Sequence, residues 1–270
     1  DTKERAVVYS IADALKFELE PTEYLLDGMI ESASFICVYG DPGCGKTWIT
    51  LDLGFAVASG ETWLNKQTAQ GAVLLVDEES GRKRLSKRIG KTLRGHDAAD
   101  NIPLFFTSLA RFDLLTQKDI DALGEIVNRY GAKLVIIDSY AAVFDGDENS
   151  KEESQPALIA LRTMCDATGA TIIVIHHANK QGGFRGTTAL AAAVDLMLKV
   201  EKDGAKVTIE STKARDVDNV KLAALMNFGD NTFNLSPIEV EKNAPKLKDG
   251  EKFAVQWLDV HGQGWIEDIA

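Results

Sequence analysis

The feature that most constrains the fold is a short stretch in which three glycines surround a lysine and a threonine. It reads Gly40-Asp41-Pro42-Gly43-Cys44-Gly45-Lys46-Thr47 and fits the pattern G-x-x-x-x-G-K-[ST] of the phosphate-binding P-loop. The apolar run Phe35–Tyr39 precedes it, and a helical stretch that starts at Trp48 follows it. This is the strand–loop–helix setting in which the loop N–H groups and the helix dipole face an anion.

The motif predicts a role for each of its parts. We expect residues 40–47, together with Trp48 directly after them, to bind ATP. Lys46 would reach the β- and γ-phosphates, and Thr47 would hold Mg²⁺. The alternative, a glycine-rich turn with a chance lysine, does not account for the strand before the motif and the helix after it.

Composition narrows the class of protein. The 270 residues include 30 basic and 41 acidic side chains, for a net charge of −11. This argues against a surface that is basic all over and clings to nucleic acid, but it allows a local basic patch or pore. Three cysteines, Cys37, Cys44 and Cys165, have no metal-ligand spacing, which favours a reduced, cytoplasmic setting.

The same sequence lacks the marks of a membrane protein. No apolar run reaches membrane-spanning length and no signal peptide is evident, so we expect no membrane partner. The chain begins at Asp1 rather than Met, and we expect it to be a trimmed piece of a longer protein.

Strands and helices alternate along most of the chain. The expected strands are 35–39, 72–77, 104–107, 133–138, 170–176, 195–200, 206–211 and 222–228. Helical patterns, such as 117–130 and 155–168, separate the first five, which predicts an α/β fold with a mostly parallel twisted sheet and helices on both faces. The last three strands have short connections, with Lys202-Asp203-Gly204 as a hairpin turn, and predict an antiparallel extension.

Residues 1–235 are expected to form one domain, with a lead-in over 1–33. Residues 236–250 contain two prolines and many polar residues and are expected to be a linker. An amphipathic helix follows within 251–270. It is typical of a winged-helix module cut off after its first helix, and equally of a C-terminal helix packed on the main domain.

Carboxylates end two of the expected strands. The apolar run 134–137 leads into Asp138, the Walker B pattern, so we expect Asp138 to hold Mg²⁺ directly or through water. The next residue is Ser139, which disfavours ATPases that place their base there. The run 73–76 leads into acidic residues, of which Glu79, ahead of Glu78, is the expected base that activates water. The alternative is solvated acids that cap the next helix.

Two histidines end another expected strand. His176 and His177 follow the apolar run 172–175, and a polar group at such a strand end can respond to the γ-phosphate. Zinc binding is the competing interpretation, but no Cys or His partner has suitable spacing. A strand-end histidine without a special function is the third alternative.

Cations gather in three further places. Arg185 lies in a glycine-rich loop that suits an arginine finger or a DNA contact. Lys213 and Arg215 follow a strand and could contact a phosphate across a subunit boundary. The helix after Ser80 carries seven cations, for which a solvated or subunit-facing surface is favoured over a DNA-contacting one. These seven are Arg82, Lys83, Arg84, Lys87, Arg88, Lys91 and Arg94.

In order along the chain, these motifs resemble the RecA/DnaB superfamily, and most closely the hexameric plasmid replication helicases of the RepA type. The matching stretches are 40–47, 73–80 with Arg88, 134–138 with the loop 146–149, 176–180 and 185–188. The resemblance implies a RecA-like fold in which Lys46 and Thr47 bind phosphate and Mg²⁺, Glu79 is the base, Asp138 is Walker B, His177 senses the γ-phosphate and Arg185 acts in trans. Lys213 and Arg215 resemble a pair presented to a neighbour's ATP, although Asp216-Val217-Asp218 departs from the usual continuation.

The expected function is therefore that of an ATP-hydrolysing ring, a hexamer with ATP between subunits, which moves along single-stranded DNA as a replicative helicase. Two alternatives remain. One is an ATP-regulated DNA-binding or assembly module that does not unwind DNA. The other is a small-molecule kinase, which the acidic pair Glu78 and Glu79 and the polar strand end at 176–177 fit poorly.

Overall fold

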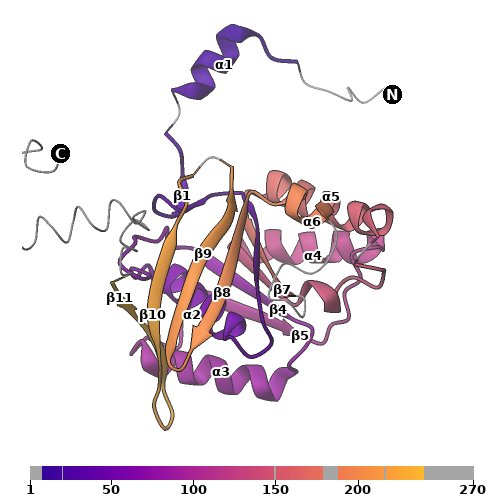
Figure 1. Cartoon of the computed structure of the whole chain (residues 1–270). Helices are drawn as coiled ribbons and strands as arrows, with labels where there is room; N and C mark the ends of the chain where they lie inside the picture. The colour runs from indigo at the N-terminus through magenta and orange to yellow at the C-terminus, as the bar shows by residue number, and fades with distance from the viewer. Residues whose placement is uncertain (1–7, 20, 149, 179–187, 216, 240–270) are drawn as a thin grey trace, which may run out of the picture. The chain divides into compact units, whose positions relative to one another are not determined.

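A computed structural model describes residues 8–19, 21–148, 150–178, 188–215 and 217–239. Within them, nine strands form one sheet in the order β11-β10-β9-β8-β3-β7-β6-β4-β5 (Figure 1). Their bounds are β3 (Phe35–Gly40), β4 (Ala72–Asp77), β5 (Leu104–Ser108), β6 (Ala132–Asp138), β7 (Thr171–His177), β8 (Leu196–Asp203), β9 (Lys206–Ala214), β10 (Lys221–Phe228) and β11 (Phe233–Ile238). A separate antiparallel pair joins β1 (Tyr24–Leu26) to β2 (Ile30–Glu31).

The predicted fold class is confirmed. Strands β8, β3, β7, β6, β4 and β5 pair in parallel, and β9, β10 and β11 extend the sheet in antiparallel order. The turn between β8 and β9 contains Gly204 at a φ of 58°, a left-handed conformation that glycine adopts without steric cost. The expected hairpin at this turn is therefore present.

Helices cover both faces of the sheet (Figure 1). On one face lie α2 (Lys46–Ser59) and α3 (Arg82–Gly95), and on the other lie α4 (Gln117–Tyr130), α5 (Lys151–Thr168) and α6 (Thr188–Ala193). The alternation of β3 shows how one apolar strand serves two cores, because Ile36 and Val38 belong to the first and Phe35, Cys37 and Tyr39 to the second. A single-turn helix η1 (Tyr140–Ala142) follows β6, and α1 (Ile11–Glu18) contains no buried residue.

Two short regions differ from the expected organisation. The lead-in 1–33 contains β1 and β2, which are only three and two residues long and leave too little pattern to detect. Strand β11 runs through residues 236–238 of the expected linker. Pro237 is tolerated there because β11 is the last strand of the sheet, where one side of the backbone needs no ladder partner. The rest of that linker, apart from Glu239, and the expected helix within 251–270 lie outside the described residues.

The described helices include none that is long and apolar enough to cross a bilayer. The expected helix 117–130 matches α4 at both ends, and the expected helix 155–168 is the C-terminal part of α5. Helix α5 starts four residues earlier because Ser150 caps it by accepting a hydrogen bond from the Glu153 amide.

A buried carboxylate ties α2 to α3 and β11. Asp52 of α2 accepts hydrogen bonds from Trp63 Nε1 at 3.1 Å and the Leu235 amide at 3.2 Å, and it lies 2.8 Å from His96 Nε2. His96 ends α3, and its Nδ1 lies 3.1 Å from Glu61. Burial of the ring opposes its charged form, but Asp52 and Glu61 outweigh that effect, so the pKa of His96 is raised above its ordinary value.

This arrangement predicts a pH-dependent stability. The pKa of His96 is higher in the folded chain than in the unfolded chain. Its contribution to the free energy of unfolding is therefore fully present below the unfolded pKa of about 6.5 and is lost as pH rises through the folded pKa. His96→Gln should lower the free energy of unfolding by about 1–3 kcal/mol at the acidic end, because Asp52 loses a charged partner. Urea unfolding from pH 6 to pH 9 measures both chains, and an equal pH trend in the variant would contradict the assignment.

Candidate nucleotide-binding site

Parallel pairing brings four strand ends to one edge of the sheet. Gly40, which ends β3, is paired with His177, which ends β7. Asp77, which ends β4, is paired with Asp138, which ends β6. Because the carboxyl ends of parallel strands form the usual ligand crevice of such sheets, the P-loop, both carboxylates and the histidine pair are gathered in one place.

The P-loop connects β3 to α2 with the expected backbone freedom. Gly43 and Gly45 have φ values of 79° and 98°, which side chains other than glycine rarely adopt. A Cβ atom on Gly45 would also lie 2.7 Å from the methyl carbon of Met226 in β10. The loop is therefore held closely from the side of the antiparallel extension.

Lys46 is buried, and its ammonium group stays over the loop. Nζ donates to the carbonyl oxygens of Gly40 at 2.8 Å and Asp41 at 3.0 Å. It also lies 3.9 Å from Cys44 Sγ, and burial raises the pKa of that thiol. A buried cation that has only neutral partners in the described chain suits an anionic ligand.

Thr47 and Asp138 meet across two elements. The Thr47 hydroxyl donates to Asp138 Oδ2 at 2.6 Å. Burial raises the pKa of Asp138, and Glu79 and Asp77 add to this effect, while the Thr47 hydroxyl and Arg88 oppose it. A bound Mg²⁺ would favour the charged carboxylate.

The donor set fits Mg²⁺. This ion takes oxygen ligands and keeps several waters, so it is commonly held by one or two protein oxygens together with substrate phosphates. Thr47 and Asp138 supply such a pair. No group of three or more His, Cys, Asp and Glu residues suited to a metal occurs within the described residues.

The two candidate bases have different surroundings. Glu78 accepts hydrogen bonds from the amides of Ala110 at 3.0 Å and Arg111 at 2.8 Å, so it anchors the loop after β5. Burial raises the pKa of Glu78, an effect that these amides oppose. The Glu79 side chain is 52 % exposed, and its Oε2 lies 3.8 Å from His177 Nε2. Glu79 is thus the carboxylate of the pair that is open to water.

The two histidines also have different surroundings. His176 is buried, packs edge-on against Tyr140, and has its Nε2 4.0 Å from Glu148 of the loop 146–149. His177 lies beside Glu79, and its buried Nδ1 has no hydrogen-bond partner in the described part of the chain. Buried polar atoms without partners are rare, which makes His177 a candidate for contact with a ligand.

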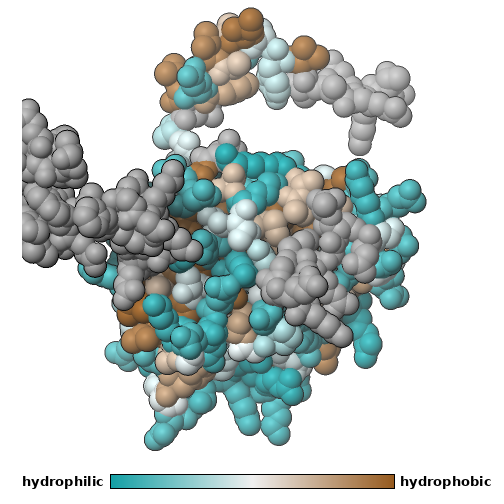
Figure 2. All heavy atoms as spheres, viewed as in Figure 1, coloured by the Kyte–Doolittle hydropathy of each residue, from teal (hydrophilic) through white to brown (hydrophobic). Residues whose placement is uncertain are grey.

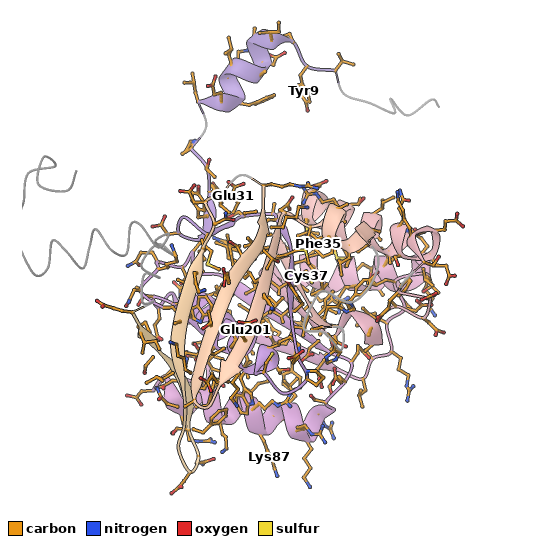
Figure 3. The ribbon with its side chains drawn as sticks, in the orientation of Figure 1. Tyr9, Glu31, Phe35, Cys37, Lys87 and Glu201 are labelled. Carbon is orange, nitrogen blue, oxygen red and sulfur yellow. The ribbon has the colours of Figure 1, made fainter. Side chains whose placement is uncertain are left out.

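A cleft of about 610 Å³ adjoins the P-loop. Residues 41–44 form one wall, and the β8–β9 hairpin, including Glu201 and Lys206, forms the other. Figure 3 labels Glu201 on this hairpin. The volume lies in the range of small-molecule sites, so the cleft has room for a nucleotide beside the loop.

Trp48 contributes differently from the loop before it. Its ring packs against Phe233 at 4.5 Å and Phe228 at 5.2 Å between centroids, and the Arg88 guanidinium carbon lies 5.8 Å from its centroid. Arg88 also donates to the Ser80 hydroxyl at 2.8 Å. The side chain of Trp48 therefore joins α2 to α3 and β10–β11, and nucleotide contact by Trp48 stays a prediction.

Lys213 and Arg215 lie away from this edge. Lys213 is paired with Met197 near the start of β8, whereas the P-loop is level with Val200. Lys213 Nζ donates to the carbonyls of Ala191 and Val194, both at 2.6 Å. Arg215 pairs with Asp195 at 3.2 Å, and Asp195 also pairs with Arg162. These contacts leave both cations outside the nucleotide site of this chain. Arg185 lies outside the described residues.

Comparison with known proteins agrees with this geometry. The family model AAA_25, described as an AAA domain, matches residues 2–183. The chain therefore belongs to the AAA_25 family. Its P-loop places it in the P-loop superfamily of ATPases.

Curated relatives include DNA repair protein RadA from Halalkalibacterium halodurans, with 26% identity over 183 residues, and from Bacillus subtilis, with 24% over 191. The matches cover 66% and 69% of this chain but only 35% and 37% of the relatives, so the chain spans about a third of their length.

Solved structures support the fold. The ATPase domain of G40P superposes with a TM-score of 0.62 and 13% identity, over 84% of this chain and 96% of that one. A DnaB-like replicative helicase, solved in a study of its interactions with primase, superposes with a TM-score of 0.64 and 14% identity. The match covers 83% of this chain and 66% of that one. The chain thus has the RecA-like ATPase fold.

Arg88 is the residue whose place in the site the sequence indicated least clearly. It shares a helix with six other cations, and only its contacts with Ser80 and Trp48 distinguish it. Met226 and Phe233 were also missed, because their contacts with Gly45 and Trp48 arise from strand pairing far along the chain.

The geometry predicts the effect of removing the buried cation. Lys46→Ala should weaken binding of a fluorescent ATP analogue by about 10- to 100-fold, because a charge-assisted hydrogen bond to phosphate is lost. Lys118→Ala, on the exposed surface of α4, is the matched control and should bind as the original chain does. Equal binding by both variants would contradict the assignment of Lys46.

Proposed function

We propose that this chain is the ATP-hydrolysing motor domain of a ring-forming replicative DNA helicase or translocase, of the RepA type found in plasmids, phages and mobile elements. The observation that carries the proposal is the meeting of Lys46, the Thr47–Asp138 pair and the Glu79–His177 pair at one edge of the sheet. These are the parts that phosphoryl transfer to water requires.

In the proposed reaction, Lys46 and the P-loop amides bind the phosphates. Thr47 and Asp138 hold Mg²⁺, which neutralises charge on the phosphate oxygens when bound. Glu79 orients the attacking water and accepts its proton, because it is the exposed carboxylate at this edge. His177, 3.8 Å from Glu79, changes its contacts when the γ-phosphate is lost. This change is transmitted to the residues that follow β7.

Shared sites between subunits complete the proposal. Arg185 of one subunit stabilises charge on the phosphoryl group bound by the next, and Lys213 and Arg215 serve the same neighbour. In a ring of six, hydrolysis then moves loops along single-stranded DNA in a central channel. The resemblance supports this arrangement, and so does the structural similarity to a DnaB-like replicative helicase.

A second candidate function is an ATP-regulated DNA-binding or assembly module without unwinding activity. The relatives matched by sequence are named DNA repair proteins, a description that fits this second function as well. It requires the same P-loop but no coupling between hydrolysis and movement.

The two adjacent glutamates provide a matched test of the base. Glu79→Gln should lower ATP turnover by about 10²- to 10⁴-fold while nucleotide binding is kept, because the proton acceptor is lost. Glu78→Gln should keep most of its turnover, because Glu79 is unchanged and the amide oxygen of glutamine can still accept one of the two hydrogen bonds from the loop after β5. Single-turnover hydrolysis measures both variants. The reverse order of effects would transfer the role of base to Glu78.

The dependence of rate on protein concentration tests the ring. The steady-state ATPase rate per subunit should climb with concentration, because the active site is completed by a neighbour, and should rise further with single-stranded DNA. A rate that climbs with concentration but ignores DNA would favour the assembly module. A rate that ignores both would contradict the shared site and the motor together.

A further inference from the structure

Helix α3 carries an unusual concentration of positive charge. Its 14 residues contain seven of the chain's 30 basic residues and no acidic residue. Since the whole chain has a net charge of −11 and α3 contributes +7, the other residues carry −18. Seven of the 30 basic residues therefore lie within 14 of the 270 residues.

The cations of α3 form one outward face. Lys83, Lys87 and Lys91 follow each other at one-turn spacing, about 6 Å apart along the axis, and Arg84 lies beside them. The opposite face packs on the core through Leu85, with Thr92 also buried. We call these four cations, Lys83, Arg84, Lys87 and Lys91, the basic face. Lys87 points away from the sheet in Figure 3, and hydrophilic residues predominate at the lower edge of Figure 2, where α3 lies.

The part of the chain that the structure describes does not neutralise this face. Among the described residues, no ion pair involves Lys83, Arg84, Lys87 or Lys91, although the chain has 41 acidic residues. The first turn of α3 holds Arg82, Lys83 and Arg84 and no acid, so these charges also oppose the positive end of the helix dipole. A polyanion would relieve both repulsions.

From this we infer that the basic face of α3 binds the phosphate backbone of nucleic acid. The helix has no aromatic residue with which to stack a base, so the contact is to phosphates and is independent of sequence. An acidic surface of a second copy is the competing partner. The even spacing of lysines and the lack of apolar side chains on the face favour phosphates, because protein interfaces are depleted in lysine and centred on apolar residues.

The position of α3 connects this contact to the proposed reaction, on which this part of the inference rests. Gly81, directly before α3, and Ser80 donate their amides to Asp77, and Arg88 on the inner side of α3 donates to the Ser80 hydroxyl. Ser80 follows Glu79 in sequence. A phosphate backbone on the outer side therefore acts on the helix that positions the residue next to the proposed base.

Charge removal with a matched control tests the inference. The variant Lys83→Gln, Lys87→Gln, Lys91→Gln keeps helix propensity and leaves Arg88 in place. Its control, Lys118→Gln, Arg129→Gln, Lys151→Gln, removes the same charge from exposed positions on α4 and α5. Binding of labelled oligothymidylate, and of a duplex of equal length, is measured by fluorescence anisotropy at several salt concentrations.

The α3 variant should bind oligothymidylate at least about tenfold more weakly than the original chain. The slope of log affinity against log salt concentration should be smaller in magnitude by about 2. The control should match the original chain, and the duplex measurement identifies which form of nucleic acid is bound. Unchanged affinity and slope, or equal weakening by the control, would overturn the inference. So would unchanged affinity with altered sedimentation, which would assign the face to a second copy.

The same samples separate this inference from the proposed function. ATP hydrolysis without DNA should be equal in the α3 variant and the original chain. Hydrolysis by the original chain together with unchanged oligonucleotide binding by the variant would overturn the inference alone. Absence of hydrolysis in the original chain would overturn the proposed function, while the binding comparison would still decide the role of α3.

Discussion

The parallel pairing of β3, β7, β6 and β4 is the constraint on which the site depends. It sets Gly40 beside His177 and Asp77 beside Asp138, so the loops that follow these four strands all begin at one edge of the sheet. A slip of one residue in any pair would exchange the faces of that strand and separate the Thr47 hydroxyl from Asp138. The apolar cores on both faces fix the register, because each strand alternates between them. The positions of the site residues at the strand ends therefore depend on the packing of the two apolar cores.

A second set of contacts holds the P-loop helix from outside the parallel sheet. Met226 packs on Gly45, Phe233 on Trp48, and the Leu235 amide donates to Asp52, so β10 and β11 contact the start and the middle of α2. The family match ends at residue 183, before these strands begin. The antiparallel extension thus adds restraint to a loop whose catalytic pattern belongs to the matched region. It also joins α3, since Nδ2 of the Asn234 side chain donates to the Gly95 carbonyl at 3.0 Å.

The sequence predicted the parallel core well because strands buried on both faces read as continuous apolar runs, and 72–77 matches β4 at both ends. It missed β11, whose residues Asn234, Ser236 and Pro237 are typical of loops, because an edge strand tolerates them. The sequence favoured Glu79 over Glu78 as the base. The structural difference between the two is that the loop after β5 brings the amides of Ala110 and Arg111 to Glu78. No local pattern contains such a contact between distant segments.

The uneven distribution of charge has a structural consequence. Like charges along α3 repel each other and the helix dipole, so the inward contacts of Leu85, His96 and Arg94 must hold the helix in place. Arg94 donates to Asn231 in the β10–β11 turn, and His96 pairs with Asp52. The end of α3 is thus anchored to the hairpin and to α2, while its start is held by the buried Leu85 and by contacts with Asp77 and Ser80, beside Glu79. The start of α3 therefore lies next to the proposed base, and contacts on the inner side of the helix set its position there.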